Sequence, residues 1–169
     1  DQYIDSLRDY YLLRRGELLL VDIDFHELAN TLREFYQVSV QKTQIDFKVY
    51  VDQNTNFKND LSLIELIIHN LLSNAFKYQN DLQENQFIHV SITVSKGNLT
   101  IRVKDNGIGI PADAKEEIFK LFYRASNQSQ GMGFGLYNVS AALLKIQGTI
   151  EIESELLKGT EFIVNIPSK

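Results

Sequence analysis

The 169-residue chain has no cysteine and no tryptophan, with one methionine and two prolines. Without cysteine it can form neither a disulfide nor a thiolate metal site. Its three histidines, His26, His69 and His89, stand too far apart in the sequence to suggest a zinc set. Long apolar runs are missing too, since none approaches the roughly 20 residues that a membrane-spanning helix needs. We therefore expect neither a zinc site nor a membrane span in this stretch of chain.

Basic residues are fewer than acidic residues in this chain. The chain has 17 Lys and Arg against 22 Asp and Glu, which gives a net charge of -5. A nucleic-acid surface needs clustered lysine and arginine to neutralise phosphates, so no nucleic-acid partner is expected. The hydrophobic fraction of 44% is enough for one sizeable core. A chain of this length therefore predicts one globular domain.

Hydrophobic spacing alternates between helical and strand periods. Helices are predicted over residues 3–15, 24–42, 60–77, 112–121 and 136–146. Strands are predicted over residues 45–51, 88–94, 99–103, 150–152 and 162–166, with a polar turn over residues 52–59. Asp24 is the expected N-cap of the second helix, with Glu27 reaching back to it. Asp60 is the expected N-cap of the third helix, and Gly148 is expected to end the last.

This order of elements predicts an α+β fold. Residues 96–98 join two predicted strands as a hairpin, and hairpins make neighbouring strands antiparallel. Each long helix carries one apolar stripe, so the helices are expected to cover one face of the sheet. We predict a two-layer α/β sandwich whose mixed, mostly antiparallel sheet is covered on one face by helices.

One edge of the third predicted helix carries polar residues that suggest a binding role. At 3.6 residues per turn, Asn70, Asn74 and Lys77 fall in one narrow stripe. A solvated helix face is the simpler alternative, but asparagine forms helices poorly and other polar residues would fill such a face better. Amide oxygens suit Mg²⁺, and a nearby lysine would neutralise phosphates. The stripe therefore indicates a site for a metal-bound phosphate.

Two glycine-rich segments follow. Residues 105–109, with the sequence DNGIG, stand at a strand end, where glycines let backbone approach a ligand, although an ordinary turn has the same composition. Residues 131–135, with the sequence GMGFG, precede the last predicted helix, where backbone amides and the helix dipole favour an anion. A merely flexible loop is the alternative. The spacing fits neither the dinucleotide fingerprint nor a GxxxxGK[ST] phosphate loop, and the protein-kinase motifs are missing.

Together these segments resemble the conserved boxes of sensor histidine kinases, in the superfamily that also holds gyrase-like and chaperone-like ATPases (GHKL). The matching segments are residues 70–78 for the N box, 105–109 and 131–136 for the two glycine boxes, 117–124 for the F box, and 158–162 for the final GT-x-F strand. Their order and spacing together are specific to this family, and the resemblance covers nearly the whole chain. The resemblance implies a Bergerat-type fold that binds ATP and Mg²⁺.

The resemblance also implies a role for each residue. Asn74, assisted by Asn70, would hold Mg²⁺ against the triphosphate, and Lys77 would contact phosphate. Asp105 would accept the adenine amino hydrogen, while Gly107 and Gly109 would shape the base pocket. Further nucleotide contacts are implied for Tyr78, Arg124, Gly131, Gly133, Gly135 and Leu136. The polar residues 125–130 would form a mobile ATP lid, anchored by Phe119 and Phe122.

On the same resemblance, the chain would transfer the ATP γ-phosphate to a histidine on a dimerisation domain. Residues 1–20 would be the C-terminal end of the dimerisation and phosphoacceptor helix with its linker, and residues 21–169 the catalytic ATP-binding domain. The implied partners are that phosphoacceptor domain and a response regulator receiver domain, within a full-length homodimer. The expected location is cytoplasmic, and anchoring of the parent protein in the inner membrane is an expectation from the family.

None of the three histidines is expected to accept phosphate. His26 is followed by Glu27, as family acceptors are, but the expected cap explains Glu27, and His26 lies on the catalytic domain's own first helix. His69 is predicted on a solvated helix face and His89 on the outer face of a strand.

Two other functions stay open from the sequence alone. A gyrase-like or chaperone-like ATPase would carry glutamate at Asn70 to activate water, which an amide cannot do. A signalling module that binds nucleotide without transferring phosphate is the second alternative. One departure from the family is Leu157, where a glycine is common, and we expect it to affect a turn more than the pocket.

Overall fold

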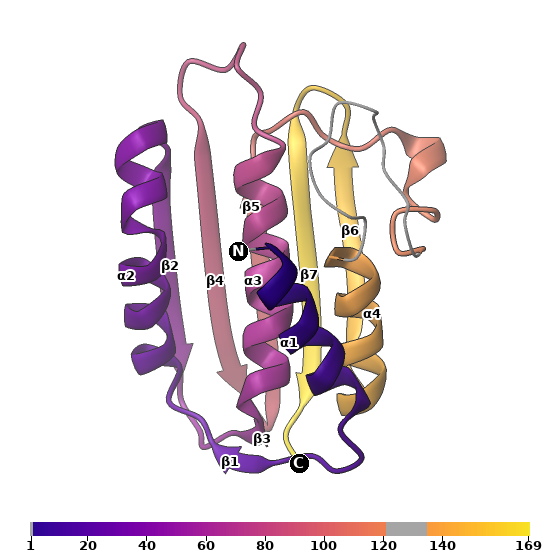
Figure 1. The fold of residues 1–169 in the computed structure, drawn as a ribbon. Helices are drawn as coiled ribbons and strands as arrows, with labels where there is room; N and C mark the ends of the chain where they lie inside the picture. The colour runs from indigo at the N-terminus through magenta and orange to yellow at the C-terminus, as the bar shows by residue number, and fades with distance from the viewer. Residues whose placement is uncertain (1, 121–134) are drawn as a thin grey trace.

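The computed structural model describes residues 2–120 and 135–169 (Figure 1). The helices are α1 (Gln2–Arg14), α2 (Phe25–Thr43), α3 (Leu61–Lys77) and α4 (Gly135–Ile146), with a 3-10 turn η1 (Ala112–Ala114). The strands are β1 (Leu20–Asp22), β2 (Asp46–Gln53), β3 (Lys58–Asp60), β4 (Phe87–Ser95), β5 (Asn98–Asp105), β6 (Thr149–Glu155) and β7 (Gly159–Pro167).

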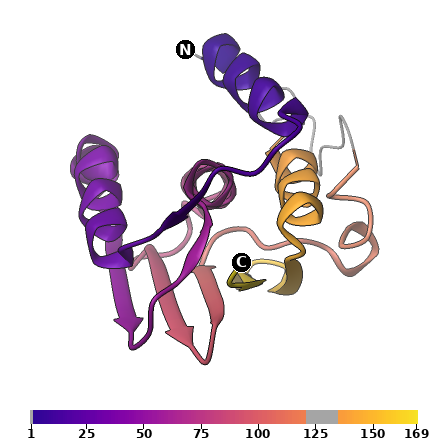
Figure 2. The same cartoon turned by 90° about the horizontal axis from the view of Figure 1, so that it is seen from below.

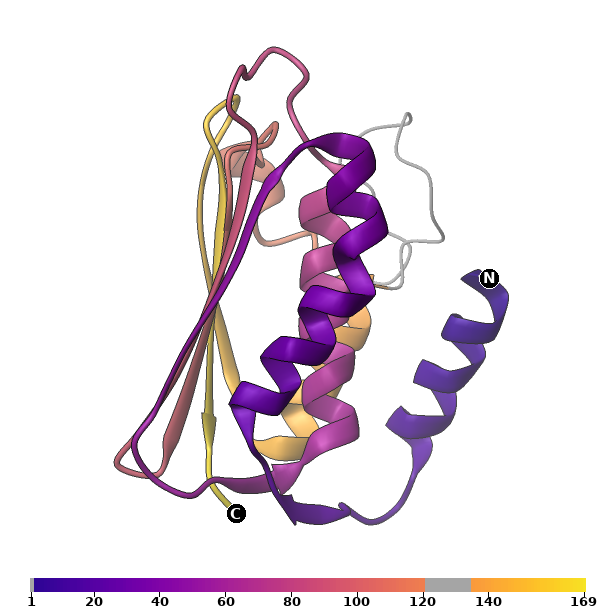
Figure 3. The ribbon, with the colours of Figure 1, turned by 90° about the vertical axis from the view of Figure 1, so that its left-hand side faces the viewer.

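A five-stranded sheet forms one layer, with the strand order β2-β4-β5-β7-β6. The β2–β4 pair is parallel, and the other neighbours are antiparallel. Helices α2, α3 and α4 lie side by side across one face of this sheet, and Figure 3 shows the two layers edge-on. The predicted two-layer α+β sandwich with a mixed, mostly antiparallel sheet is therefore confirmed.

The core lies between the sheet and α3. In β4 and β5 the alternate residues that face α3 are fully or almost fully buried: Ile88, Val90, Ile92, Val94, Leu99, Ile101 and Val103. Helix α3 buries eight apolar residues, more than a single stripe, because it has the sheet on one side and other helices on its flanks. Burying that surface supplies most of the favourable folding energy and fixes the direction of the polar edge of α3.

A two-stranded sheet, β1 with β3, was not predicted. The predicted turn over residues 52–59 is correspondingly wrong at both ends, because β2 runs to Gln53 and β3 begins at Lys58. Within that stretch Phe57 is 1% exposed, and its ring centroid lies 5.6 Å from that of Phe25. A lone aromatic in a polar stretch gave no periodic signal, so its core role was missed.

The helix ends agree with the predicted caps in two cases. Asp24 Oδ1 accepts from the amides of His26, at 2.9 Å, and Glu27, at 3.3 Å. Asp60 Oδ1 accepts from the amide of Leu63 at 3.2 Å. Both carboxylates thereby satisfy amides that have no partner within their helix.

Two other helix predictions need correction. Gly148 does not carry the left-handed conformation that ends α4, because Gln147 does, with φ 58°. The absence of a side chain at Gly148 instead allows close packing, since a Cβ there would lie 2.6 Å from Leu143 Cδ2 and 3.0 Å from the carbonyl oxygen of Asn165. The helix expected over residues 112–121 is only the single turn η1, and further turns follow it as far as residue 119.

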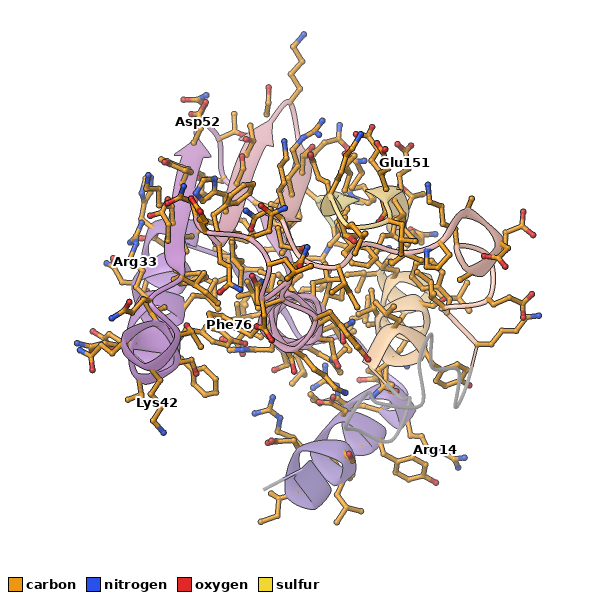
Figure 4. All side chains as sticks on the ribbon, turned by 90° about the horizontal axis from the view of Figure 1, so that it is seen from above. Arg14, Arg33, Lys42, Asp52, Phe76 and Glu151 are labelled. Atoms are coloured by element: carbon orange, nitrogen blue, oxygen red, sulfur yellow. The ribbon has the colours of Figure 1, made fainter. Side chains whose placement is uncertain are left out.

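His69 does not lie on a solvated face. Its Nδ1 is 2.9 Å from the hydroxyl of Tyr36, and it belongs to an aromatic cluster between α2 and α3. In that cluster Tyr36 stacks on Phe76 with 5.1 Å between ring centroids, and Figure 4 shows Phe76 on the side of α3 that faces α2. Helical periodicity placed His69 on the solvated face but could not show that α2 packs there. His89 lies on the outer sheet face as expected, with its Nε2 3.0 Å from Asp46 Oδ2.

Helix α1 lies on the far side of the helical layer from the sheet, across α3 and α4 (Figures 2 and 3). Arg15, just after α1, forms an ion pair with the carboxylate of Asp60, which is 1% exposed. The backbone carbonyl of Arg15 also accepts from Lys145 Nζ at 2.8 Å. In residues 2–120 and 135–169 no helix is both long and apolar enough to cross a membrane.

Candidate nucleotide-binding site

The two asparagines of the α3 edge face the first turn of α4. A Cβ built on Gly135 would lie 3.1 Å from Asn70 Oδ1 and 4.0 Å from Asn74 Oδ1. Their spacing of one helical turn puts both amide oxygens on one side of α3, as predicted. The absence of a side chain at Gly135 leaves those oxygens uncovered at that point. The structure thus brings Asn70, Asn74 and Gly135 together.

Lys77 and Tyr78 form the end of α3. Lys77 is exposed, and its Nζ lies 5.3 Å from the centroid of the Tyr78 ring. Tyr78 is the C-cap, and its amide donates to the carbonyl of Asn74 at 3.0 Å. An exposed ammonium at this end of the helix can reach an anionic ligand by rotation of its own side chain. It contacts neither asparagine in the structure.

Asp105 is the last residue of β5 and is 9% exposed. Its Oδ1 accepts from the amide of Gly107 at 2.8 Å, and it also accepts a backbone hydrogen bond from Thr160. Burial raises the pKa of Asp105 to about 6, and the two backbone hydrogen bonds oppose that shift. Two amide donors thus fix the orientation of a buried carboxylate, which makes it a well-placed acceptor for a ligand N–H group.

The glycines after Asp105 allow close backbone contacts. The amide of Ile108 donates to the carbonyl of Tyr78 at 3.0 Å. A Cβ on Gly107 would lie 2.2 Å from that same carbonyl oxygen. Gly109 has φ +70°, and a Cβ there would lie 2.1 Å from the carbonyl oxygen of Glu155. Segment 105–109 is therefore held between the end of α3 and the β6–β7 turn, not a plain surface turn.

The β6–β7 turn supports this segment, a role that the sequence did not predict. The amide of Leu157 donates to the carbonyl of Ile108 at 2.7 Å. Leu157 has φ 65°, a left-handed conformation that explains the glycine common at this position in the family. Ser154 Oγ accepts from the amide of Ile110 at 2.8 Å. The turn thus contacts the predicted base-binding segment directly, through backbone atoms of Leu157.

Several predicted residues lie outside the part that the structure describes. These are Phe122, Arg124, Gly131, Gly133 and the lid residues 125–130. Phe119 and Leu136 are described, and both are partly buried against the core. The predicted contacts that the structure does bring together form one strip: Asn70, Asn74 and Gly135 at one end, and Tyr78, Asp105, Gly107 and Gly109 at the other.

The donor set favours magnesium over zinc. Within residues 2–120 and 135–169, no group of three or more His, Cys, Asp or Glu side chains could hold a metal ion. Two neighbouring amide oxygens are hard ligands, and Mg²⁺ takes only one or two protein ligands when phosphate oxygens and waters complete its octahedron. The residues present therefore fit Mg²⁺ that arrives with a polyphosphate.

The fold and the strip define a nucleotide-binding class. The family model described as "Histidine kinase-, DNA gyrase B-, and HSP90-like ATPase" matches residues 59–169. Since this is more than half of the chain, the chain belongs to that family. Among solved structures, the catalytic domain of histidine kinase ThkA matches with a TM-score of 0.76 at 24% identity, over 89% of this chain and 98% of that one. Full-length ShkA in complex with AMPPNP matches with a TM-score of 0.82 at 24% identity, over 99% of this chain and 36% of that one.

Curated relatives of this chain include sensor kinases. The sensor protein RprX of Bacteroides fragilis is 29% identical over 91% of this chain and 30% of its own length. The sensor histidine kinase YclK of Bacillus subtilis is 26% identical over 94% of this chain and 34% of its own length. This chain thus spans about a third of those relatives. The expected ATP-binding catalytic domain of the sensor histidine kinase type is confirmed at the level of family and fold.

Proposed function

We propose that this chain binds ATP with Mg²⁺ and transfers the γ-phosphate to a histidine side chain on a dimerisation domain. The observation that carries the proposal is the strip described above. Asn70 and Asn74 converge beside Gly135, and the same helix ends where Tyr78 is bonded to the segment that holds Asp105. Phosphate ligands and base ligands are therefore joined by one helix.

Each residue would do a separate task. Asn74 and Asn70 would hold Mg²⁺ through their amide oxygens, and the ion would neutralise triphosphate charge when bound. Lys77 would contact a phosphate oxygen. Asp105 would accept the adenine amino hydrogen, and its two backbone bonds keep it aimed. Phosphoryl transfer asks the protein mainly for such positioning and charge stabilisation.

The same residues argue for transfer rather than hydrolysis. At neutral pH an amide cannot take a proton, so Asn70 cannot activate water as a glutamate would. The base that helps the acceptor histidine would lie beside that histidine, outside this chain. We therefore expect slow ATP hydrolysis in the absence of an acceptor.

The partners follow from the relatives' greater length. We propose that residues 1–20 end a dimerisation and phosphoacceptor helix, and that residues 21–169 are the catalytic domain. In support, Ile4, Leu7 and Tyr11 of α1 are 65%, 66% and 74% exposed and recur at helical spacing. Such an exposed apolar face is typical of a surface that binds a partner. We further propose that the parent protein is a homodimer and that its partner is a response regulator receiver domain. This chain would lie in the cytoplasm, on a parent protein anchored in the inner membrane.

Calorimetric titration of ATP with Mg²⁺ tests the site. Asn74→Ala should weaken ATP binding by tenfold or more, because it removes a metal ligand. Asn56→Ala is the matched control, since Asn56 is exposed in the β2–β3 connection, and its affinity should equal that of the wild type. Equal affinity in Asn74→Ala and wild type would refute the metal site.

A second assay separates the functions. The chain with its native upstream residues is incubated with ATP labelled at the γ-phosphate, and acid-labile, base-stable label on protein is measured. Label on histidine supports the proposed transfer. Rapid release of phosphate without label favours the ATPase alternative, and binding without either favours a signalling module.

A further inference from the structure

Three polar side chains from three helices meet beside the asparagine edge. Asp9 of α1 reaches the seam between α3 and α4. Its Oδ2 lies 3.5 Å from the Nδ2 atom of Asn70 and 3.5 Å from the Nδ2 atom of Asn138. Asn138 belongs to α4 and stands three residues after Gly135, so it lies on the same side of that helix. Neither Asp9 nor Asn138 was singled out by the sequence.

Asn138 is 8% exposed, which is unusual for a side-chain amide. A buried amide is costly unless its N–H groups find acceptors. The acceptor that it finds is the Asp9 carboxylate, which belongs to a helix outside the two-layer sandwich. Apolar packing alone would be better served by leucine at this position. The amide therefore suggests a specific anionic partner.

The Asp9 carboxylate is held by amides rather than by a cation. Burial raises its pKa, while the hydrogen bond from Asn70, the charge of Arg8 and the hydrogen bond from Asn138 oppose that shift, and Asp5 adds to it. Among the described residues no lysine or arginine forms an ion pair with Asp9. The two N–H groups thus converge on one anionic oxygen, and the 3.5 Å distances are long for such bonds. The carboxylate is therefore weakly bound.

We infer that Asn138 is a further nucleotide-binding residue: together with Asn70 it donates an amide N–H to a phosphate oxygen of ATP, at the position that the Asp9 carboxylate takes in this structure. The inference rests on the proposed function. Asn70 can serve both purposes. Its Oδ1 faces Gly135, and its Nδ2 donates one hydrogen to the carbonyl of Leu66 at 2.8 Å, which leaves the second hydrogen for the acceptor on the Asp9 side. Asp9 and the triphosphate compete for the same two donors, because two anions would repel each other there.

The competition predicts opposite effects for the two variants. With Mg²⁺ present, Asn138→Ala should lower ATP affinity about tenfold, because a hydrogen bond to a charged oxygen is lost. Asp9→Asn should raise ATP affinity severalfold, because the competing charge is gone. Ser140→Ala on α4 and Asp22→Asn on β1 are controls at exposed positions, and both should leave the affinity unchanged. Affinity for adenosine, which has no phosphate, should be the same in all of these proteins.

Other outcomes overturn the inference. If Asn138 only pins α1 to the domain, Asn138→Ala will leave ATP affinity unchanged or raise it as Asp9→Asn does. If Asp9 is a metal ligand, Asp9→Asn will weaken ATP binding. Should Asn138→Ala fail to fold, Asn138→Leu keeps the buried volume without the donor and is read in the same way. A wild type that binds no ATP would instead refute the proposed function itself.

Discussion

The amide of Ile108 donates to the carbonyl oxygen of Tyr78, 3.0 Å away. Tyr78 caps the helix that carries Asn70 and Asn74, and Ile108 belongs to segment 105–109, which begins with Asp105. This bond therefore couples the two ends of the candidate site through backbone alone. A change that separates these two residues should disturb both ends together.

Gly107→Ala should have that effect. A Cβ at residue 107 would lie 2.2 Å from the Tyr78 carbonyl oxygen and 2.9 Å from Asp105 Oδ1. Backbone must move to relieve the first contact, which should cost about 1–3 kcal/mol of unfolding free energy. ATP affinity should also fall, because this movement of the backbone would weaken the hydrogen bond between Ile108 and Tyr78. Urea unfolding and ATP titration measure the two effects.

Gly16→Ala is the control, because a Cβ at Gly16 would meet nothing within 4 Å. It should change neither stability nor affinity appreciably. A Gly107→Ala protein as stable as the wild type would mean that the loop does not pack on α3 as described.

The fold was predictable because its cause is periodic. Alternation in β4 and β5 reflects one buried face in each strand, and the apolar stripe of α3 marks the side that packs on the sheet. Elements without a period were missed: the short pair β1–β3, the buried Phe57 and the helix-flank position of His69. Each depends on which distant segment packs there, and a single sequence does not record that.

The site was predictable to a similar degree. Asn70 and Asn74 share a helical edge, so local geometry placed them together. Gly107 and Gly109 were predicted as pocket residues from the resemblance, but the atoms they pack on, the carbonyls of Tyr78 and Glu155, are main-chain atoms that any residue would supply. Asp9 and Asn138 meet Asn70 only through tertiary packing, and no motif marks them.

Asp105→Asn should change how stability depends on pH. Burial raises the pKa of Asp105 from 3.8 to about 6, so the folded state holds this proton more tightly than the unfolded state. The stability from this group is complete below about pH 4 and is lost as pH rises through about 6. Relative to Asp105→Asn, the wild type should lose about 2–3 kcal/mol between about pH 4 and pH 7.

Chemical unfolding at several pH values measures this difference. Asp113→Asn is the control, because Asp113 is an exposed aspartate in η1. If the difference in unfolding free energy between wild type and Asp105→Asn stays constant from about pH 4 to pH 7, folding does not raise the pKa of Asp105. ATP affinity should fall in Asp105→Asn at pH 7, because the neutral amide accepts the adenine hydrogen more weakly.

Leu157→Gly should stabilise the domain. Leu157 has φ 65° and a side chain that is 56% exposed, so the change removes backbone strain and little buried surface. We expect a gain of about 0.5–1 kcal/mol in unfolding free energy. Leu156→Gly is the matched comparison, since Leu156 is similarly exposed, at 54%, without a positive φ, and it should be neutral or destabilising. Equal losses in both variants would contradict the argument from strain.

Arg15→Met should loosen α1 and destabilise the domain. Asp60 is 1% exposed, and its carboxylate faces the Arg15 guanidinium and the amide of Leu19, the latter at 2.9 Å. Removing the cation leaves a buried charge, which should cost about 3 kcal/mol. Hydrogen exchange should show faster opening of α1, because its C-terminal anchor is lost.

The reciprocal change should cost less than Arg15→Met. Asp60→Asn keeps an oxygen that can cap α3 at the amide of Leu63, and asparagine is as good an N-cap as aspartate. Arg15, whose side chain is 20% exposed, can then turn its guanidinium toward water. Unfolding free energies of both single variants and the double variant measure this asymmetry. If the buried charge is what makes the pair costly to break, the double variant will be no less stable than Arg15→Met. A double variant whose loss equals the sum of the two single losses would instead mean that the two side chains act independently.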